Sequence, residues 1–119
     1  MVVKGRVIKG CNHFEGRMSR HSEAFEKTVG HPLHAGTINV EIDEAIEIRE
    51  DLRLKGEEIS WYEDFIFERC KINGRDGYRI RPIDKNGDGG HGDNVLEISC
   101  AEWVPDVGDG ADVVVELFR

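Results

Sequence analysis

Short runs in which apolar and polar residues alternate recur along this chain, and turns rich in Gly, Asn and Asp separate them. Alternation with a period of two places successive side chains on opposite faces of an extended strand, so each run predicts a strand with one buried face. The runs are VVKGRVIKG at 2–10, GTINVEIDEAIEI at 36–48, DFIFERCKI at 64–72, GYRIRPID at 77–84, NVLEISCA at 94–101 and ADVVVELF at 111–118.

The clearest local signal is the turn between the runs at 64–72 and 77–84. It reads NGRDG and contains both Asn73-Gly74 and Asp76-Gly77. Asn-Gly and Asp-Gly adopt the positive φ angles that tight hairpins need, so this segment predicts an antiparallel hairpin.

One helix is expected, at about Ser19 to Val29, because Phe25 and its neighbours form a narrow apolar stripe and Gly30 and Pro32 then end the pattern. No linker or repeat interrupts the 119 residues. The chain is therefore expected to be mainly β: a single domain over residues 1–119, forming a small six-stranded β-barrel with one helix on its side.

The net charge of −8 excludes a general nucleic-acid binder, which needs a basic face to neutralise phosphates. A local basic pocket within the acidic surface stays open. No apolar run approaches the ~20 residues of a membrane helix, and none resembles a signal peptide. Cys11, Cys70 and Cys100 are widely spaced and odd in number, which favours idle or buried thiols in a reducing cytoplasm.

Two metal hypotheses come from local motifs. The loop DKNGDGGHGDN at 84–94 opens like a calcium-binding loop, but position twelve is Val95 rather than the required Glu, so only a looser calcium site stays open. The five histidines lack the HxH, HxxxH and HExxH spacings of transition-metal sites, and surface or turn positions are expected for them. These are His13, His21, His31, His34 and His91.

Two further segments could act together on a phosphorylated ligand. GCNHFEGR at 10–17 lies between the first strand and the helix; its glycines permit backbone amides to approach phosphates, and Arg17 adds a positive charge. Thr37 and Asn39 are two apart on a strand and share a face. Their neutral oxygens suit Mg²⁺ when a nucleotide supplies the anionic ligands.

Taken in order, these segments resemble the archaeal-type, CTP-dependent riboflavin kinases. The helix SEAFEKTVG is followed by HAGTINVEID, which is similar to that family's G-T-L-N-L segment. NVLEISCA is similar to its I-I-E-I-I-A-P strand, and DVGDGADVVVELF to its L-x-D-G-D-x-V-x-I end. The similarity extends through nearly the whole chain.

The resemblance implies a cradle-loop β-barrel that transfers the γ-phosphate of CTP to riboflavin, giving FMN and CDP. It implies that Thr37 and Asn39 bind Mg²⁺, and that Glu97 contacts the flavin. Gly10, Gly16 and Arg17 match parts of the family's nucleotide-binding glycine loop. Positioning and electrostatic stabilisation would supply most of the catalysis. Trp103 is a candidate for stacking on a base or flavin ring, beside the plainer role of a core or rim residue.

A second hypothesis is a non-catalytic binding or assembly module that keeps the barrel and has lost the nucleotide and flavin sites. Its basis is the segment 12–15, where Asn-His-Phe-Glu replaces the middle glycine of the family's loop. Such a module would have a protein partner or form a homo-oligomer. The candidate interface residues are Trp61, Tyr62 and Phe65, provided that they are exposed rather than part of the core.

Overall fold

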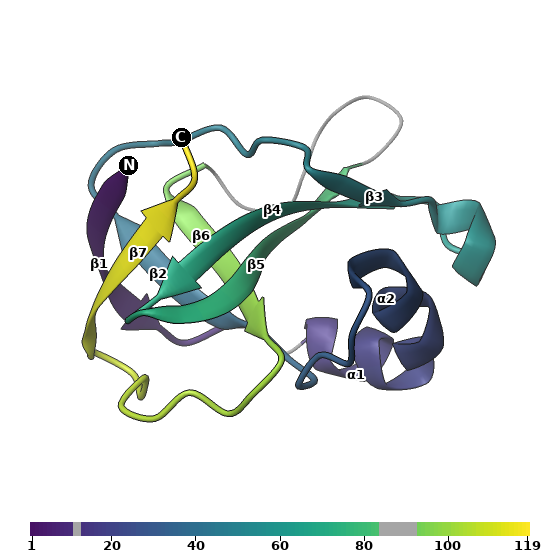
Figure 1. Cartoon of the computed structure of the whole chain (residues 1–119), viewed down its shortest axis with the longest axis horizontal. Coiled ribbons are helices and arrows are strands. Elements are labelled where there is room, and N and C mark those ends of the chain that lie inside the picture. The colour runs from purple at the N-terminus through teal and green to yellow at the C-terminus, as the bar shows by residue number, and fades with distance from the viewer. Residues whose placement is uncertain (11–12, 84–92) are drawn as a thin grey trace.

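The computed structural model describes residues 1–10, 13–83 and 93–119 and shows a closed antiparallel β-barrel with a helical pair on one side (Figure 1). The strands are β1 (Val2–Ile8), β2 (Ile38–Ile42), β3 (Leu52–Leu54), β4 (Asp64–Ile72), β5 (Arg75–Ile83), β6 (Val95–Cys100) and β7 (Asp112–Leu117). The helices are α1 (His13–Arg20), α2 (Ser22–Val29) and a short 3-10 turn, η1 (Gly56–Ile59).

The sheet order is β3-β4-β5-β6-β2-β1-β7, and an additional pairing of β4 with β7 closes it. Six strands therefore form the barrel, and β3 is an extra strand paired with the first half of β4. The prediction of a mainly β, six-stranded barrel is confirmed.

The Asn-Gly hairpin joins β4 to β5 as predicted. Asn73 has φ 49° and Gly74 φ 79°, the pair of positive angles that a two-residue hairpin turn requires. Nine residue pairs, from Ile72 with Arg75 to Asp64 with Ile83, hold the two strands in register. The long ribbon of β4 and β5 extends from the barrel towards the helices (Figure 1).

Two expected boundaries differ from the structure. The single helix expected at 19–29 is instead two eight-residue helices that meet at His21. The strand expected at 36–48 ends at Ile42, and irregular chain follows it. Ile46, which continued the alternation in the sequence, still packs against the core as a half-buried residue.

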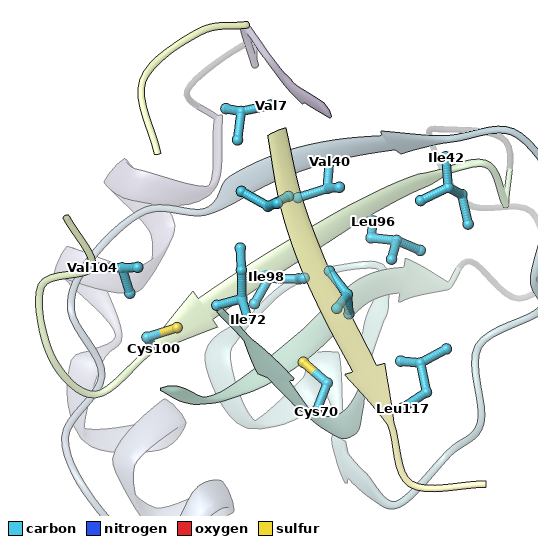
Figure 2. Close-up of a cluster of buried hydrophobic side chains, with 12 residues drawn as sticks. Val7, Val40, Ile42, Cys70, Ile72, Leu96, Ile98, Cys100, Val104 and Leu117 are labelled. Atoms are coloured by element: carbon cyan, nitrogen blue, oxygen red, sulfur yellow. The ribbon is translucent and has the colours of Figure 1, made fainter. Parts of the chain in front are cut away.

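The barrel interior is filled by aliphatic side chains and two thiols. Its buried residues are Val7, Val40, Ile42, Cys70, Ile72, Leu96, Ile98, Cys100, Val104, Val113, Val115 and Leu117. Figure 2 shows Cys100 and Val104 towards one end of this cluster and Ile42 and Leu117 towards the other. We call the end near Cys100 and Val104 the cavity end, and the end near Ile42 and Leu117 the charged end.

A second core lies outside the barrel, between the helices and the β4–β5 ribbon. Phe25 of α2 is 1% exposed and packs between Phe65 and Phe67, with ring centroids 5.7 and 6.0 Å away. Met18 of α1 and Ile80 of β5 complete this contact. The helices are thereby fixed to the barrel wall by aromatic packing.

Charged side chains also lie inside the barrel. Glu68 lies two residues before the inward Cys70 and so shares its face of β4. It pairs in register with Arg79, and both Glu68 and Arg79 are 1% exposed or less. Arg79 lies 3.7 Å from Glu68 Oε1 and 3.9 Å from Asp93 Oδ1, while Arg119 Nε lies 3.0 Å from Glu68 Oε2. Removal from water lowers the pKa of Arg79, whereas the carboxylates of Glu68 and Asp93 oppose that shift.

Candidate functional site

A cavity of about 290 Å³ opens at the cavity end of the barrel. It lies where β2 begins, where β6 ends, and where the segment 101–107 passes between β6 and β7. Its lining residues are His34, Ala35, Gly36, Thr37, Ile38, Asn39, Ile98, Cys100, Glu102, Trp103, Val104 and Val107.

The apolar part of the lining belongs to the barrel core. Ile38 pairs in register with Ile98, and Cys100 and Val104 extend the same surface. Most small-molecule sites have this character, an apolar surface with a few polar groups that orient the ligand. A volume of about 290 Å³ holds part of such a ligand rather than all of it.

The rim contains an aromatic pair. The rings of His34 and Trp103 lie 5.7 Å apart, and Trp103 is 70% exposed. The backbone here is fixed, because the His34 amide donates to the Cys100 carbonyl at 2.8 Å and Ser99 Oγ donates to the His34 carbonyl at 3.2 Å. An exposed indole on a fixed rim is available for stacking against a flat ligand.

Thr37 and Asn39, the predicted Mg²⁺ ligands, both line this cavity. Asn39 is 7% exposed, and its Oδ1 is buried without a hydrogen-bond partner among the described residues. A buried acceptor without a partner carries a desolvation cost that a donor or a cation would remove. The amide oxygen of Asn39 is therefore chemically suited to bind the predicted Mg²⁺.

Gly10, from the predicted nucleotide loop, lies directly against Asn39. A Cβ built on Gly10 would be 2.1 Å from Asn39 Nδ2, a distance that no side chain tolerates. Ile8, which pairs in register with Asn39, lies just before this glycine. The structure therefore brings together one residue of the predicted loop and one residue of the predicted metal pair.

Glu97, the predicted flavin contact, is only partly brought to the site. It pairs in register with Asn39 and is 8% exposed. However, it lines a separate, smaller hollow between β5 and β6, together with Arg79 and Arg81. Glu97 and Thr37 therefore do not share a cavity.

Gly16 and Arg17 are placed elsewhere. The segment 13–17, expected as a glycine-rich loop, forms the first turns of α1, so both residues are helical. Arg17 lies 4.1 Å from the centre of the Trp61 ring. The two residues line a hollow beside η1 that shares no residue with the Thr37–Asn39 cavity. The expectation of one continuous phosphate loop over residues 10–17 is wrong for its second half.

Cys70 and Cys100 are buried free thiols, as expected. Burial is the main cause that raises the pKa of Cys70 to about 12 and that of Cys100 to about 11. Neither is a reactive thiolate near neutral pH. Cys11 lies outside the described residues.

No group of three or more His, Cys, Asp or Glu side chains within the described residues could hold a metal ion. His31 Nε2 is 3.1 Å from the Tyr78 hydroxyl, and His34 is on the cavity rim. Residues 84–92, which include His91 and most of the loop of the calcium hypothesis, lie outside the described residues.

The predicted protein interface does not form as a unit. Phe65 is completely buried against the helices, and Trp61 is half-buried beneath Arg17. Tyr62 is 67% exposed and stacks on Trp61 at 4.8 Å. For Phe65 the plainer interpretation, a core residue, holds.

Sequence reasoning missed His34 and Glu102 at the cavity, and Arg20, His21 and Ser60 at the hollow beside η1. The sequence did contain a signal for the two arginines of this hollow, namely their spacing. Residues three and four apart share a helix face, so Arg17, Arg20 and His21 would have formed one basic group if 13–20 had been recognised as helical.

No model of a known protein family matches this chain, and no curated protein is significantly similar to it. Within the described residues, no helix is long and apolar enough to cross a membrane.

Proposed function

We propose that this protein is a divergent phosphotransferase of the riboflavin-kinase type, which transfers the γ-phosphate of CTP to riboflavin in the presence of Mg²⁺. The observation that carries the proposal is the cavity that contains Thr37, the unpartnered Asn39 Oδ1 and the exposed Trp103.

In this proposal Trp103 stacks on the flavin ring, and the apolar wall formed by Ile98 and Val104 covers one end of the ligand. Thr37 Oγ1 and Asn39 Oδ1 would hold Mg²⁺, which supplies charge neutralisation for the transferred phosphoryl group. Gly10 packs directly against the Asn39 amide and so helps to fix that side chain. The protein's task is to orient the hydroxyl and exclude water.

A direct test combines binding with turnover. We expect calorimetry to show that riboflavin binds, and that CTP binds more tightly with Mg²⁺ than without it. Thr37→Ala should weaken Mg²⁺–CTP binding by roughly tenfold or more, the usual effect of losing a contact to a charged group. Chromatography should then detect FMN formed from riboflavin and CTP.

Thr28→Ala is the matched control, because Thr28 donates to the Ala24 carbonyl within α2 at 2.8 Å and does not line the cavity. Its ligand binding should equal that of the unmodified protein. If riboflavin, FMN, CTP and ATP all fail to bind with or without Mg²⁺, the proposal is rejected.

A second candidate is a non-catalytic barrel that binds a flavin or nucleotide without turnover. The helical conformation of 13–17 favours it, because Gly16 and Arg17 then line a hollow that shares no residue with the Thr37–Asn39 cavity. Binding with no FMN formation from either CTP or ATP would select this candidate.

A further inference from the structure

The hollow beside η1 is a basic surface on an acidic protein. Its volume is about 560 Å³, and α1 and the residue after it contribute Arg17, Arg20 and His21. The opposite wall consists of Ile59, Ser60 and Trp61. We propose that this hollow, which we call the arginine hollow, binds a phosphoryl dianion: inorganic phosphate or the phosphate group of a monoester.

The two arginines of the hollow have no carboxylate partners among the described residues. Among the described residues, neither Arg17 nor Arg20 lies within 4.0 Å of a carboxylate oxygen. Most other described arginines do, namely Arg6, Arg49, Arg53, Arg75, Arg79, Arg81 and Arg119. In a chain with 24 acidic and 16 basic residues, two neighbouring arginines without acidic partners are available to an external anion.

Aromatic contacts preorganise the Arg17 side chain. The guanidinium carbon of Arg17 lies over Trp61, 4.1 Å from its ring centre, and 6.0 Å from the ring centre of the buried Phe65. This contact holds the side chain in place before any ligand arrives, so less conformational entropy is lost on binding. A planar guanidinium also donates two parallel hydrogen bonds to a phosphate.

Two helix ends meet at the arginine hollow. α1 ends at Arg20 and α2 begins at Ser22, with no side-chain cap at His21. The negative end of one helix dipole and the positive end of the other therefore meet here and largely cancel. The electrostatic potential of the hollow is therefore set mainly by its side chains, which include the guanidiniums of Arg17 and Arg20 and the imidazole of His21.

A carboxylate contacts the wall of the hollow: Glu63 accepts a hydrogen bond from Trp61 Nε1 at 3.2 Å. That bond directs the carboxylate to the indole edge, whereas Arg17 lies over the indole face. Trp61 thus orients both groups. Glu63 helps to fix the platform on which Arg17 rests.

This inference does not depend on the proposed function, because the arginine hollow and the Thr37–Asn39 cavity share no lining residue. The experiment uses the full chain with Trp103→Phe, which leaves Trp61 as the sole tryptophan and a direct reporter. We expect inorganic phosphate to change Trp61 fluorescence saturably, whereas chloride at equal ionic strength does not.

Arg20→Gln should weaken the phosphate response by roughly tenfold to a hundredfold, because it removes charge-assisted hydrogen bonds. Arg6→Gln is the matched control and should leave the response unchanged, because Arg6 is an exposed barrel residue paired with Glu41. Glycerol 3-phosphate separates the two sources: tighter binding than inorganic phosphate indicates a monoester, and equal binding indicates the free ion.

The inference is overturned if phosphate and chloride act alike, or if Arg6→Gln weakens the response as much as Arg20→Gln does. Thermal unfolding with and without phosphate gives a second measurement. A phosphate-dependent rise in Tm that Arg20→Gln abolishes and Arg6→Gln preserves is the expected result.

Discussion

The two ends of the barrel are built from opposite chemistry. At the charged end, three ion pairs within 4 Å form a chain: Arg119 with Glu68, Glu68 with Arg79, and Arg79 with Asp93. At the cavity end the interior surface is apolar, and the one buried polar atom there without a partner among the described residues is Asn39 Oδ1.

This difference separates groups that hold the fold from groups that are free to bind. Each charge at the charged end has an ion-pair partner within the protein that a ligand would have to displace, although Glu68 Oε2 and both terminal nitrogens of Arg79 lack hydrogen-bond partners among the described residues. At the cavity end, the buried Asn39 Oδ1 has neither a hydrogen-bond partner nor an ion-pair partner among the described residues, and the Trp103 ring is exposed. Ligand binding is therefore expected at the cavity end and structural roles at the charged end.

The largest effect is expected from Arg79→Met. Removing one partner of a buried ion pair leaves Glu68 with less compensation in the barrel interior and should lower the free energy of unfolding by about 3–5 kcal/mol. Urea denaturation measures this change. Arg6→Met, at an exposed pair, should change stability by less than about 0.5 kcal/mol.

The double variant Glu68→Leu with Arg79→Met tests the reason for that loss. Removing both charges takes away the uncompensated group, so the double variant should be more stable than Arg79→Met alone. A double variant that is less stable would show that the charged end contributes through packing rather than charge.

A smaller effect is expected at the cavity end from Gly10→Ala. The new methyl group would collide with the amide of the buried Asn39, so that side chain must shift, at a cost of about 1–3 kcal/mol. Gly108→Ala is the matched control, because a Cβ there meets no atom within 4 Å. Thermal or urea unfolding compares the two, and equal stability of both variants would contradict the close Gly10–Asn39 contact.

The smallest effect is expected from Asp51, near the charged end. Burial alone would raise the pKa of Asp51, but hydrogen bonds from the Arg49 side chain and the Arg69 amide outweigh it and hold the pKa below its ordinary value. A lowered pKa in the folded state stabilises the fold above the unfolded pKa of about 3.9, and this contribution disappears as pH falls through the folded value.

Asp51→Asn should therefore cost about 1 kcal/mol at pH 7, and this cost should shrink as pH falls below the unfolded pKa of about 3.9. Urea denaturation at a series of pH values gives the difference. Glu41→Gln, at the exposed pair with Arg6, is the control and should show a change below about 0.5 kcal/mol at pH 7. A difference for Asp51→Asn that is constant with pH would contradict the ionic origin.

The strands and the hairpin could be predicted because their signals are local. Alternation of Ile38, Val40 and Ile42 fixes which face is buried, and Asn73-Gly74 fixes the turn. The inward position of Glu68 could not be predicted in this way. Its period-two pattern is intact, but the partner that permits its burial, Arg79, is eleven residues away on another strand.

The segment 10–17 shows the opposite failure. Its two glycines and its polar residues suggested a loop, since glycine disfavours helix by about 1 kcal/mol. In the structure Met18 of α1 joins the buried core that also contains Phe25, and this packing outweighs the local preference. Because residues 13–17 are helical rather than a loop, Gly16 and Arg17 lie away from the predicted site.

The sequence by itself determined the barrel class, the hairpin and the nearness of Thr37 and Asn39 at the start of β2, because each depends on residues close together in the chain. Only the tertiary structure decided that Gly10 contacts Asn39, that Glu97 lines a different hollow, and that Trp103 stands exposed at the rim. Those contacts join residues from separate strands, and their geometry follows from sheet register and barrel closure rather than from local sequence.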